Sequence, residues 1–103
     1  MKVSVGQFRP GGDTAANLGV MRELAASAGA DGSALIVFPE ESMFSIGAVE
    51  GPLAEAVEAH WTSFVQQLSF IAAEHSIAVA QPAAHLRLLM QFEIGELLQG
   101  CPQ

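Results

Sequence analysis

Glu40 is the residue of this sequence whose position best suits it for chemistry. It follows the apolar run 34–38 and Pro39, and such a run is typical of a buried strand that ends at the proline. Ligands of open parallel sheets gather at the carboxyl ends of the strands, so a carboxylate just beyond such an end is placed for proton transfer. Glu41 competes for the same role. The alternative for both residues is a loop acid that faces water.

Other side chains that could take part in catalysis are few. Lys2 is the only lysine, and Cys101 is the only cysteine. Cys101 stands beside Pro102 with no neighbour in the sequence that would activate its thiol, so we interpret it as an incidental thiol. Three histidines lack the spacing of a metal site: His60, His75 and His85. No glycine-rich fingerprint for a dinucleotide or a phosphate follows the first apolar segment, and we expect neither a metal nor a cofactor.

The first part of the chain predicts a strand followed by a helix. Residues 2–8 are rich in Val and lack Pro, which suits a strand, and the cluster at 9–12 ends that strand with a turn. Asp13 or Thr14 can cap the helix that follows, and Gly29 is a plausible stop for it. Apolar residues recur along this helix at the spacing of one face: Leu18, Met21, Leu24, Ala25 and Ala28.

The next part predicts a second strand, a second helix and a third strand. Residues 33–38 are continuously apolar, which is typical of a parallel strand covered on both faces, and the loop 39–52 is either functional or packs over the core. From about Pro52, which is acceptable at a first helical position, the helical period returns. Its apolar stripe consists of Val57, Trp61, Phe64, Val65, Leu68, Ile71 and Ala72. With residues 76–80 as a third strand, the order predicts an α/β fold with a parallel sheet.

Composition and charge exclude several kinds of partner. The 103 residues allow one domain at most, and their 50% hydrophobic and 15% charged residues exclude a disordered chain and are unusually apolar for so small a domain. The formal net charge is -7 with only four Lys and Arg, so we expect neither nucleic acid nor an anionic membrane as a partner. No segment has the apolar length of a secretory signal or of a membrane span. With one unpaired cysteine, the expected compartment is the reducing cytoplasm.

Several short motifs occur in a fixed order: Val5-Gly6-Gln7, Asp13 with Asn17, Ala28 to Asp31, Leu35 to Glu40, and Ala72 to Ala80. Each motif is common by itself. The ordered set covers about residues 2–80 and resembles the start of the nitrilase superfamily of carbon-nitrogen hydrolases. The resemblance implies an α/β fold built as a four-layer α-β-β-α sandwich, of which this chain would hold the strand-helix-strand-helix-strand start and therefore an incomplete part.

The resemblance also implies a chemistry for Glu40. Members of the superfamily hydrolyse amides, nitriles or carbamoyl compounds without a metal, by means of a Glu, a Lys and a Cys. The thiolate attacks the carbonyl or nitrile carbon, the glutamate moves protons as general base and acid, and the lysine stabilises the oxyanion. Only Glu40 matches one of these positions, so the resemblance assigns it the role of general base and implies a small amide or nitrile as substrate.

After Ala80 the sequence stops following the motifs of the superfamily. The lysine and the cysteine of that family lie well downstream of the third strand, whereas Lys2 begins the first strand and Cys101 lacks the context of the nucleophile. We therefore expect residues 1–80 to form a partial nitrilase-like domain that is inactive alone, and residues 81–103 to form a divergent tail, helical and then frayed. A truncated gene product, a frameshifted tail or a shortened chain would each give this pattern.

Two other hypotheses stay open. In the first, the tail helix completes a small non-enzymatic interaction domain, and its apolar side consists of Leu86, Leu89, Met90, Ile94 and Leu97. In the second, the chain is a working amidase with Cys101 as nucleophile. For a partial domain, the open edge and uncovered face of the sheet predict a homo-oligomer or association through the open sheet.

Overall fold

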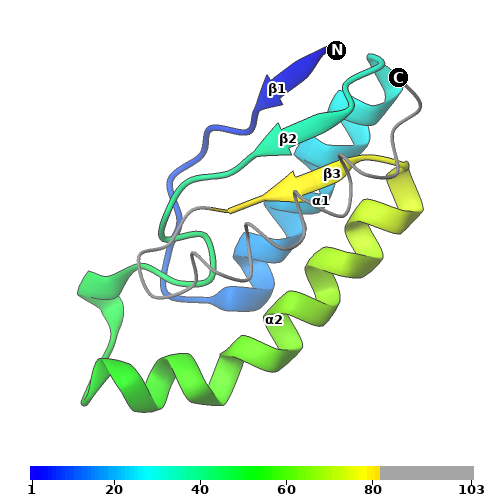
Figure 1. Cartoon of the computed structure of the whole chain (residues 1–103). Helices are drawn as coiled ribbons and strands as arrows, with labels where there is room; N and C mark the ends of the chain where they lie inside the picture. The colour runs from blue at the N-terminus through cyan, green and yellow to red at the C-terminus, as the bar shows by residue number, and fades with distance from the viewer. Residues whose placement is uncertain (82–103) are drawn as a thin grey trace.

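A parallel sheet of three strands carries two helices in the computed structural model, which describes residues 1–81 (Figure 1). The elements in chain order are β1 (Val3–Val5), α1 (Thr14–Ala30), β2 (Leu35–Val37), the 3-10 helix η1 (Ile46–Ala48), α2 (Leu53–His75) and β3 (Ala78–Ala80). The strand order is β1-β2-β3, and Val3, Leu35 and Ala78 lie side by side across the sheet. The predicted α/β class and order of elements are confirmed. The tail helix predicted from 81–103 falls almost wholly outside the described residues.

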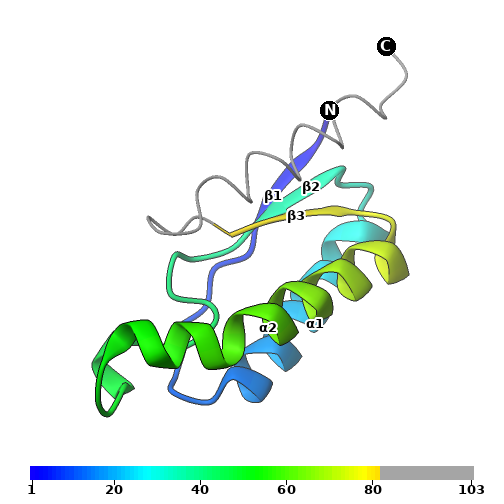
Figure 2. The same cartoon turned by 60° about the horizontal axis from the view of Figure 1, so that its bottom comes forward.

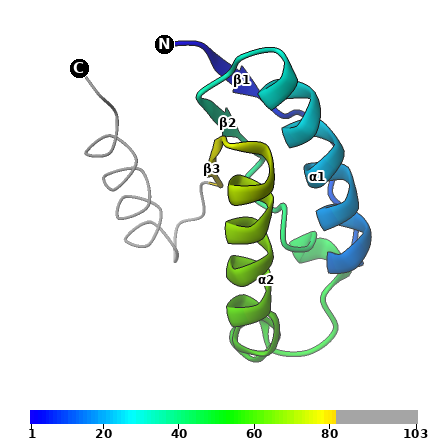
Figure 3. The ribbon, with the colours of Figure 1, turned by 90° about the vertical axis from the view of Figure 1, so that its right-hand side faces the viewer.

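Both helices cover the same face of the sheet, as two further views show (Figures 2 and 3). When the strands of a parallel sheet follow one another in one direction, crossovers of the same hand place successive helices on one face. The core lies between this face and the helices. It consists mainly of Met21, Ala25 and Ala28 from α1, Ile36 and Phe38, Phe64, Leu68 and Ile71 from α2, and Ile77 and Val79. The apolar faces predicted for the two helices are the faces that pack here.

The start of α1 confirms one of the two predicted caps. The Asp13 carboxylate accepts hydrogen bonds from the backbone N–H groups of Ala15, at 3.0 Å, and Ala16, at 3.4 Å. These groups have no partner within the helix, so an acceptor at the cap stabilises the first turn. For α2 the prediction is corrected by one position: Pro52 is the cap residue just outside the helix and not its first helical residue.

The predicted stop of α1 at Gly29 is wrong. The helix continues to Ala30, and the chain reverses at Gly32, whose φ of +85° is in the region that favours glycine. Gly29 instead serves packing, because a Cβ at this position would lie 2.8 Å from the carbonyl oxygen of His75. The absence of a side chain lets the end of α1 approach the end of α2.

The strands are shorter than predicted, and within residues 1–81 the sheet has a helix layer on one face only. Successive side chains of a strand point to opposite faces. Ile36 faces the helices and is buried, whereas Leu35 and Val37 on the other face are half-buried, which corrects the prediction that this strand is covered on both faces. On the same face Val3 and Val5 are 47% and 76% exposed. This second face is therefore an apolar surface at its β1 side.

Candidate functional site

Glu40 lies beyond the carboxyl end of β2. The strands β1 and β3 also end on this side of the sheet (Figure 1). The buried ring of Phe38 and then Pro39 separate it from the strand. Glu40 is in a turn and exposed, and within residues 1–81 its carboxylate has no hydrogen bond or ion pair. The structure thus places this acid where the sequence predicted it, just beyond the carboxyl end of a parallel strand, and ligands of parallel sheets gather at such ends.

Glu41 has a different environment, although it is also exposed. Its carboxylate oxygen Oε1 accepts a hydrogen bond of 2.7 Å from the backbone N–H of Ile46, at the start of η1. This bond closes the loop onto itself. Of the two neighbouring acids, Glu41 therefore has a structural partner and Glu40 is the one whose carboxylate is available.

The loop after β2 is held closely against the rest of the structure. Ser42 is fully buried, and its hydroxyl donates a 2.6 Å hydrogen bond to the carbonyl of Pro39. Met43 and Phe44 belong to the hydrophobic core, and the ring of Phe44 contacts the ring of His60 edge to face. The loop packs over the core, which was one of its two predicted roles, while it presents Glu40 to solvent.

Sequence reasoning missed two residues that hold this loop, Asn17 and Gln81. Each is only 4% exposed, and each donates side-chain hydrogen bonds to backbone carbonyls of the loop. For Asn17 a signal existed, because it lies one helical turn before Met21 on the apolar face of α1. A polar residue on such a face needs buried partners. Gln81 carried no comparable signal beyond its place after a strand.

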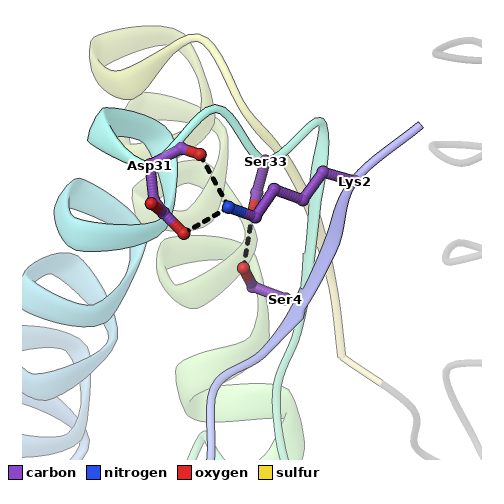
Figure 4. Close-up of polar contacts among 4 residues, drawn as sticks. All are labelled: Lys2, Ser4, Asp31 and Ser33. Carbon is purple, nitrogen blue, oxygen red and sulfur yellow. Dashed lines mark hydrogen bonds and ion pairs between the residues drawn. The ribbon is translucent and has the colours of Figure 1, made fainter.

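The one lysine of the chain lies at the opposite end of the sheet from Glu40. Its Nζ is 2.5 Å from the carboxylate oxygen Oδ2 of Asp31 and 3.0 Å from the carbonyl of the same residue (Figure 4). The hydroxyl groups of Ser4 and Ser33 form a second bond beside this pair. Because the strands are parallel, Lys2 before β1 and Glu40 after β2 stand at opposite edges. Lys2 connects the first strand to the end of α1.

The replacement Lys2→Met is expected to lower the free energy of unfolding by less than about 1 kcal/mol, because exposed ion pairs contribute little. The side chains of Lys2 and Asp31 are 53% and 69% exposed. Urea denaturation followed by circular dichroism measures the change. A loss above about 2 kcal/mol would show that this pair is a major part of the fold, contrary to its exposure.

The remaining candidate residues form no second site in the part of the chain that the structure describes. No group of three or more His, Cys, Asp or Glu among residues 1–81 could hold a metal ion. His75 is in the last turn of α2, where its Nε2 lies 3.9 Å from the Glu74 carboxylate. His85 and Cys101 lie outside the described residues. Neither α1 nor α2 combines the length and the apolar character that a membrane span requires.

Two curated proteins of Mycobacterium tuberculosis are similar to this chain. They are named Hydrolase MT0498, from strain CDC 1551 / Oshkosh, and Hydrolase Rv0480c, from strain H37Rv. Each is 37% identical over 69 residues, which cover 67% of this chain and 25% of the relative. The chain thus spans about a quarter of the length of these relatives. No solved structure gives a significant match.

The family comparison covers more of the chain. The family model described as carbon-nitrogen hydrolase matches residues 2–98, so the match includes all three strands, both helices and the loop of Glu40, and it extends beyond Ala80. This agrees with the resemblance of the ordered motifs to the nitrilase superfamily. On this match over nearly its whole length, the chain belongs to the carbon-nitrogen hydrolase family.

Proposed function

We propose that this chain supplies the amino-terminal part of an amidase- or nitrilase-like hydrolase in which Glu40 is the general base. The observation that carries the proposal is the contrast between two neighbouring acids at the carboxyl edge of the sheet. The Glu41 carboxylate accepts a bond from Ile46, whereas no described group pairs with the Glu40 carboxylate. An unpaired carboxylate on a firmly held loop suits proton transfer to and from a small amide or nitrile.

The proposed reaction also needs a cysteine thiol and a lysine ammonium. Residues 1–81 contain no cysteine, and their one lysine, Lys2, lies at the opposite end of the sheet from Glu40. For an amide, Glu40 takes the proton of a cysteine thiol as the sulfur bonds to the carbonyl carbon, and then gives that proton to the nitrogen as the C–N bond breaks. Glu40 next takes a proton from water as the water oxygen bonds to the thioester carbon, and then gives that proton to the sulfur as the C–S bond breaks, which releases the acid and restores the thiol. A lysine ammonium stabilises the oxyanion in both steps. Lys2 is paired with Asp31 at the other edge, so we expect the chain to be inactive alone.

Complementation with a relative tests this function. The 103-residue chain is mixed with the M. tuberculosis hydrolase that lacks its own matching segment, and ammonia release is measured with a panel of short amides and nitriles. We expect activity in the mixture and none from either component. The intact relative is the positive control for the panel. An assembled complex without activity, beside an active control, would refute the proposed function.

The second face of the sheet supports a proposal about partners. Its register places Val3, Leu35 and Ala78 in one row and Val5, Val37 and Ala80 in the next, without a charged side chain. Of these residues only Val3 and Val5 are exposed, so the open part of the face lies at β1. The relatives are about four times as long as the matched segment, and their remaining residues are available to cover such a face. For the 103-residue chain, we propose that a second copy covers the exposed β1 side of this face, sheet against sheet, as two layers pack in an α-β-β-α sandwich.

The replacement Val5→Glu is expected to convert the dimer into a monomer, because it places a charge on each copy within an apolar contact. Phe70→Glu is the matched control, since Phe70 is 53% exposed on the helix layer. Sedimentation velocity of both variants and the unchanged chain measures the assembly. If the chain without a substitution were a compact monomer with a cooperative melt, the dimer would be contradicted. That result would favour the hypothesis of a small interaction domain that its own tail completes. Dissociation by Phe70→Glu alone would place the contact on the helices.

A further inference from the structure

We propose that Asn17 and Gln81 are positioning residues that hold the Glu40 loop, residues 39–45, from its two sides. The inference deepens the proposed function and rests on it, because the loop matters for catalysis only if Glu40 moves protons. Neither residue carries a charge, and each is only 4% exposed. Their effect is on the place of the Glu40 backbone.

Asn17 holds the second half of the loop through Gly11. Its Oδ1 accepts a bond of 2.9 Å from the Gly11 N–H, and its Nδ2 donates to the carbonyls of Gly11, at 3.0 Å, and Met43, at 3.3 Å. The Ser45 N–H donates to the same Gly11 carbonyl at 2.8 Å. One buried amide thus joins the segment after β1, the first turn of α1 and the loop of Glu40.

Gln81 holds the first half of the loop, at Glu40 itself. It follows β3 directly, and the bond of 2.8 Å from the Phe38 N–H to the Ala80 carbonyl brings it beside Pro39. Its Nε2 donates to the carbonyl of Pro39, at 3.3 Å, and to the carbonyl of Glu40. These two carbonyls belong to the peptide groups on either side of the Glu40 Cα. An amide nitrogen has two N–H groups, which is the number that this arrangement uses.

The reason for two such contacts is the exposure of Glu40. An exposed carboxylate on a loop has no packing of its own, so its position depends on the backbone that carries it. Catalytic groups must be held within about 0.5 Å of the productive geometry, and an error of 1 Å can cost about 100-fold in rate. Asn17 and Gln81 fix the backbone on both sides of Glu40 while they leave its carboxylate accessible.

Nitrogen-15 relaxation of the 103-residue chain tests the contacts without any assay of activity. In Gln81→Met, we expect the order parameter of the Glu40 N–H to fall from about 0.85 to below about 0.6. Asn17→Asp keeps an acceptor for the Gly11 N–H but loses the donor to Met43, so hydrogen exchange of the Ser45 N–H should accelerate. The N–H groups of Ala34 and Ala78, which bond between the strands, report on the sheet and should not change. Gln66→Met, at an exposed position of α2, is the control.

A Glu40 N–H that stays rigid in Gln81→Met would overturn the proposal for Gln81, and unchanged exchange at Ser45 in Asn17→Asp would overturn it for Asn17. If Asn17→Asp fails to fold, Gln81→Met alone decides the proposal. Gln81 lies after the end of β3 and outside the helices and strands, so its replacement should leave the fold intact. Loss of order at Ala34 and Ala78 together with Glu40 would also overturn the proposal, since Asn17 and Gln81 would then support the whole sheet and not the loop alone.

The complemented hydrolase provides a second measurement for Gln81→Met. We expect kcat to fall by about 10- to 100-fold with KM and the melting temperature unchanged, because a displaced base slows the chemical step without weakening the binding of substrate. A mobile Glu40 with full kcat would show that the contacts with Gln81 exist but do not serve catalysis, which overturns the positioning role, whereas full kcat in Glu40→Gln would overturn the role of Glu40 as base. Failure of the positioning proposal and failure of the proposed function therefore give different results.

Discussion

The replacement Glu40→Gln in the complemented hydrolase is expected to lower kcat/KM for a short amide by about 1,000-fold or more. A general base contributes about 100- to 10,000-fold to the rate of such reactions, and Glu40 would act twice in each turnover. Glutamine has the same shape, but its amide cannot take a proton from the thiol or from water. Steady-state ammonia release measures the loss. Single-turnover acylation separates the first proton transfer from the second.

Glu41→Gln is the matched control for this result. It removes one negative charge from the neighbouring position, and its amide oxygen can still accept the bond from the Ile46 N–H. We expect it to keep most of the activity, within about 10-fold. Equal losses in the two variants would show that the rate depends on the local negative charge. Full activity of Glu40→Gln would exclude Glu40 as the base.

The position of Glu40 could be predicted because local signals determine it. A continuous apolar run predicts a buried strand, and a proline predicts where that strand ends. The residue after the proline must then lie beyond the carboxyl end of the strand. The two helices could be predicted equally well. In each helix apolar residues recur at the spacing of one buried face, as Met21 and Ala25 do in α1 and Phe64 and Leu68 do in α2. Each of these signals lies within one segment of the chain.

The contacts that hold the Glu40 loop could not be predicted in this way. Asn17 and Met43 are 26 residues apart, and Gln81 and Glu40 are 41 residues apart. Such bonds depend on which strand ends lie side by side, and the register of β2 and β3 decides that. The prediction for Gly29 was wrong for the same reason. Its local signal is that of a helix stop, but its role depends on the carbonyl of His75, which is distant in the sequence. The roles that could not be predicted from the sequence are therefore those that depend on tertiary contacts.

The second large effect is expected in the core, where Phe64→Ala should lower the free energy of unfolding by about 3 to 5 kcal/mol. Phe64 is 1% exposed and belongs to the cluster between α2 and the sheet, so the change removes buried apolar surface and leaves a cavity. A small domain is stable by only about 5 to 15 kcal/mol, and this single change therefore takes a large part of its stability. Urea denaturation at a fixed protein concentration measures it.

Phe70→Ala on the same helix is the control that separates burial from residue type. Phe70 is 53% exposed, so the same substitution should change the free energy of unfolding by about 0.5 kcal/mol or less. Alanine also favours the helix slightly more than phenylalanine does, which opposes any small loss of contact. If the two variants lost the same amount, α2 would not present the face of Phe64 to the sheet. The edge that carries Glu40 would then lack the support of the helix layer, because the Phe38 ring that precedes it packs in the same cluster.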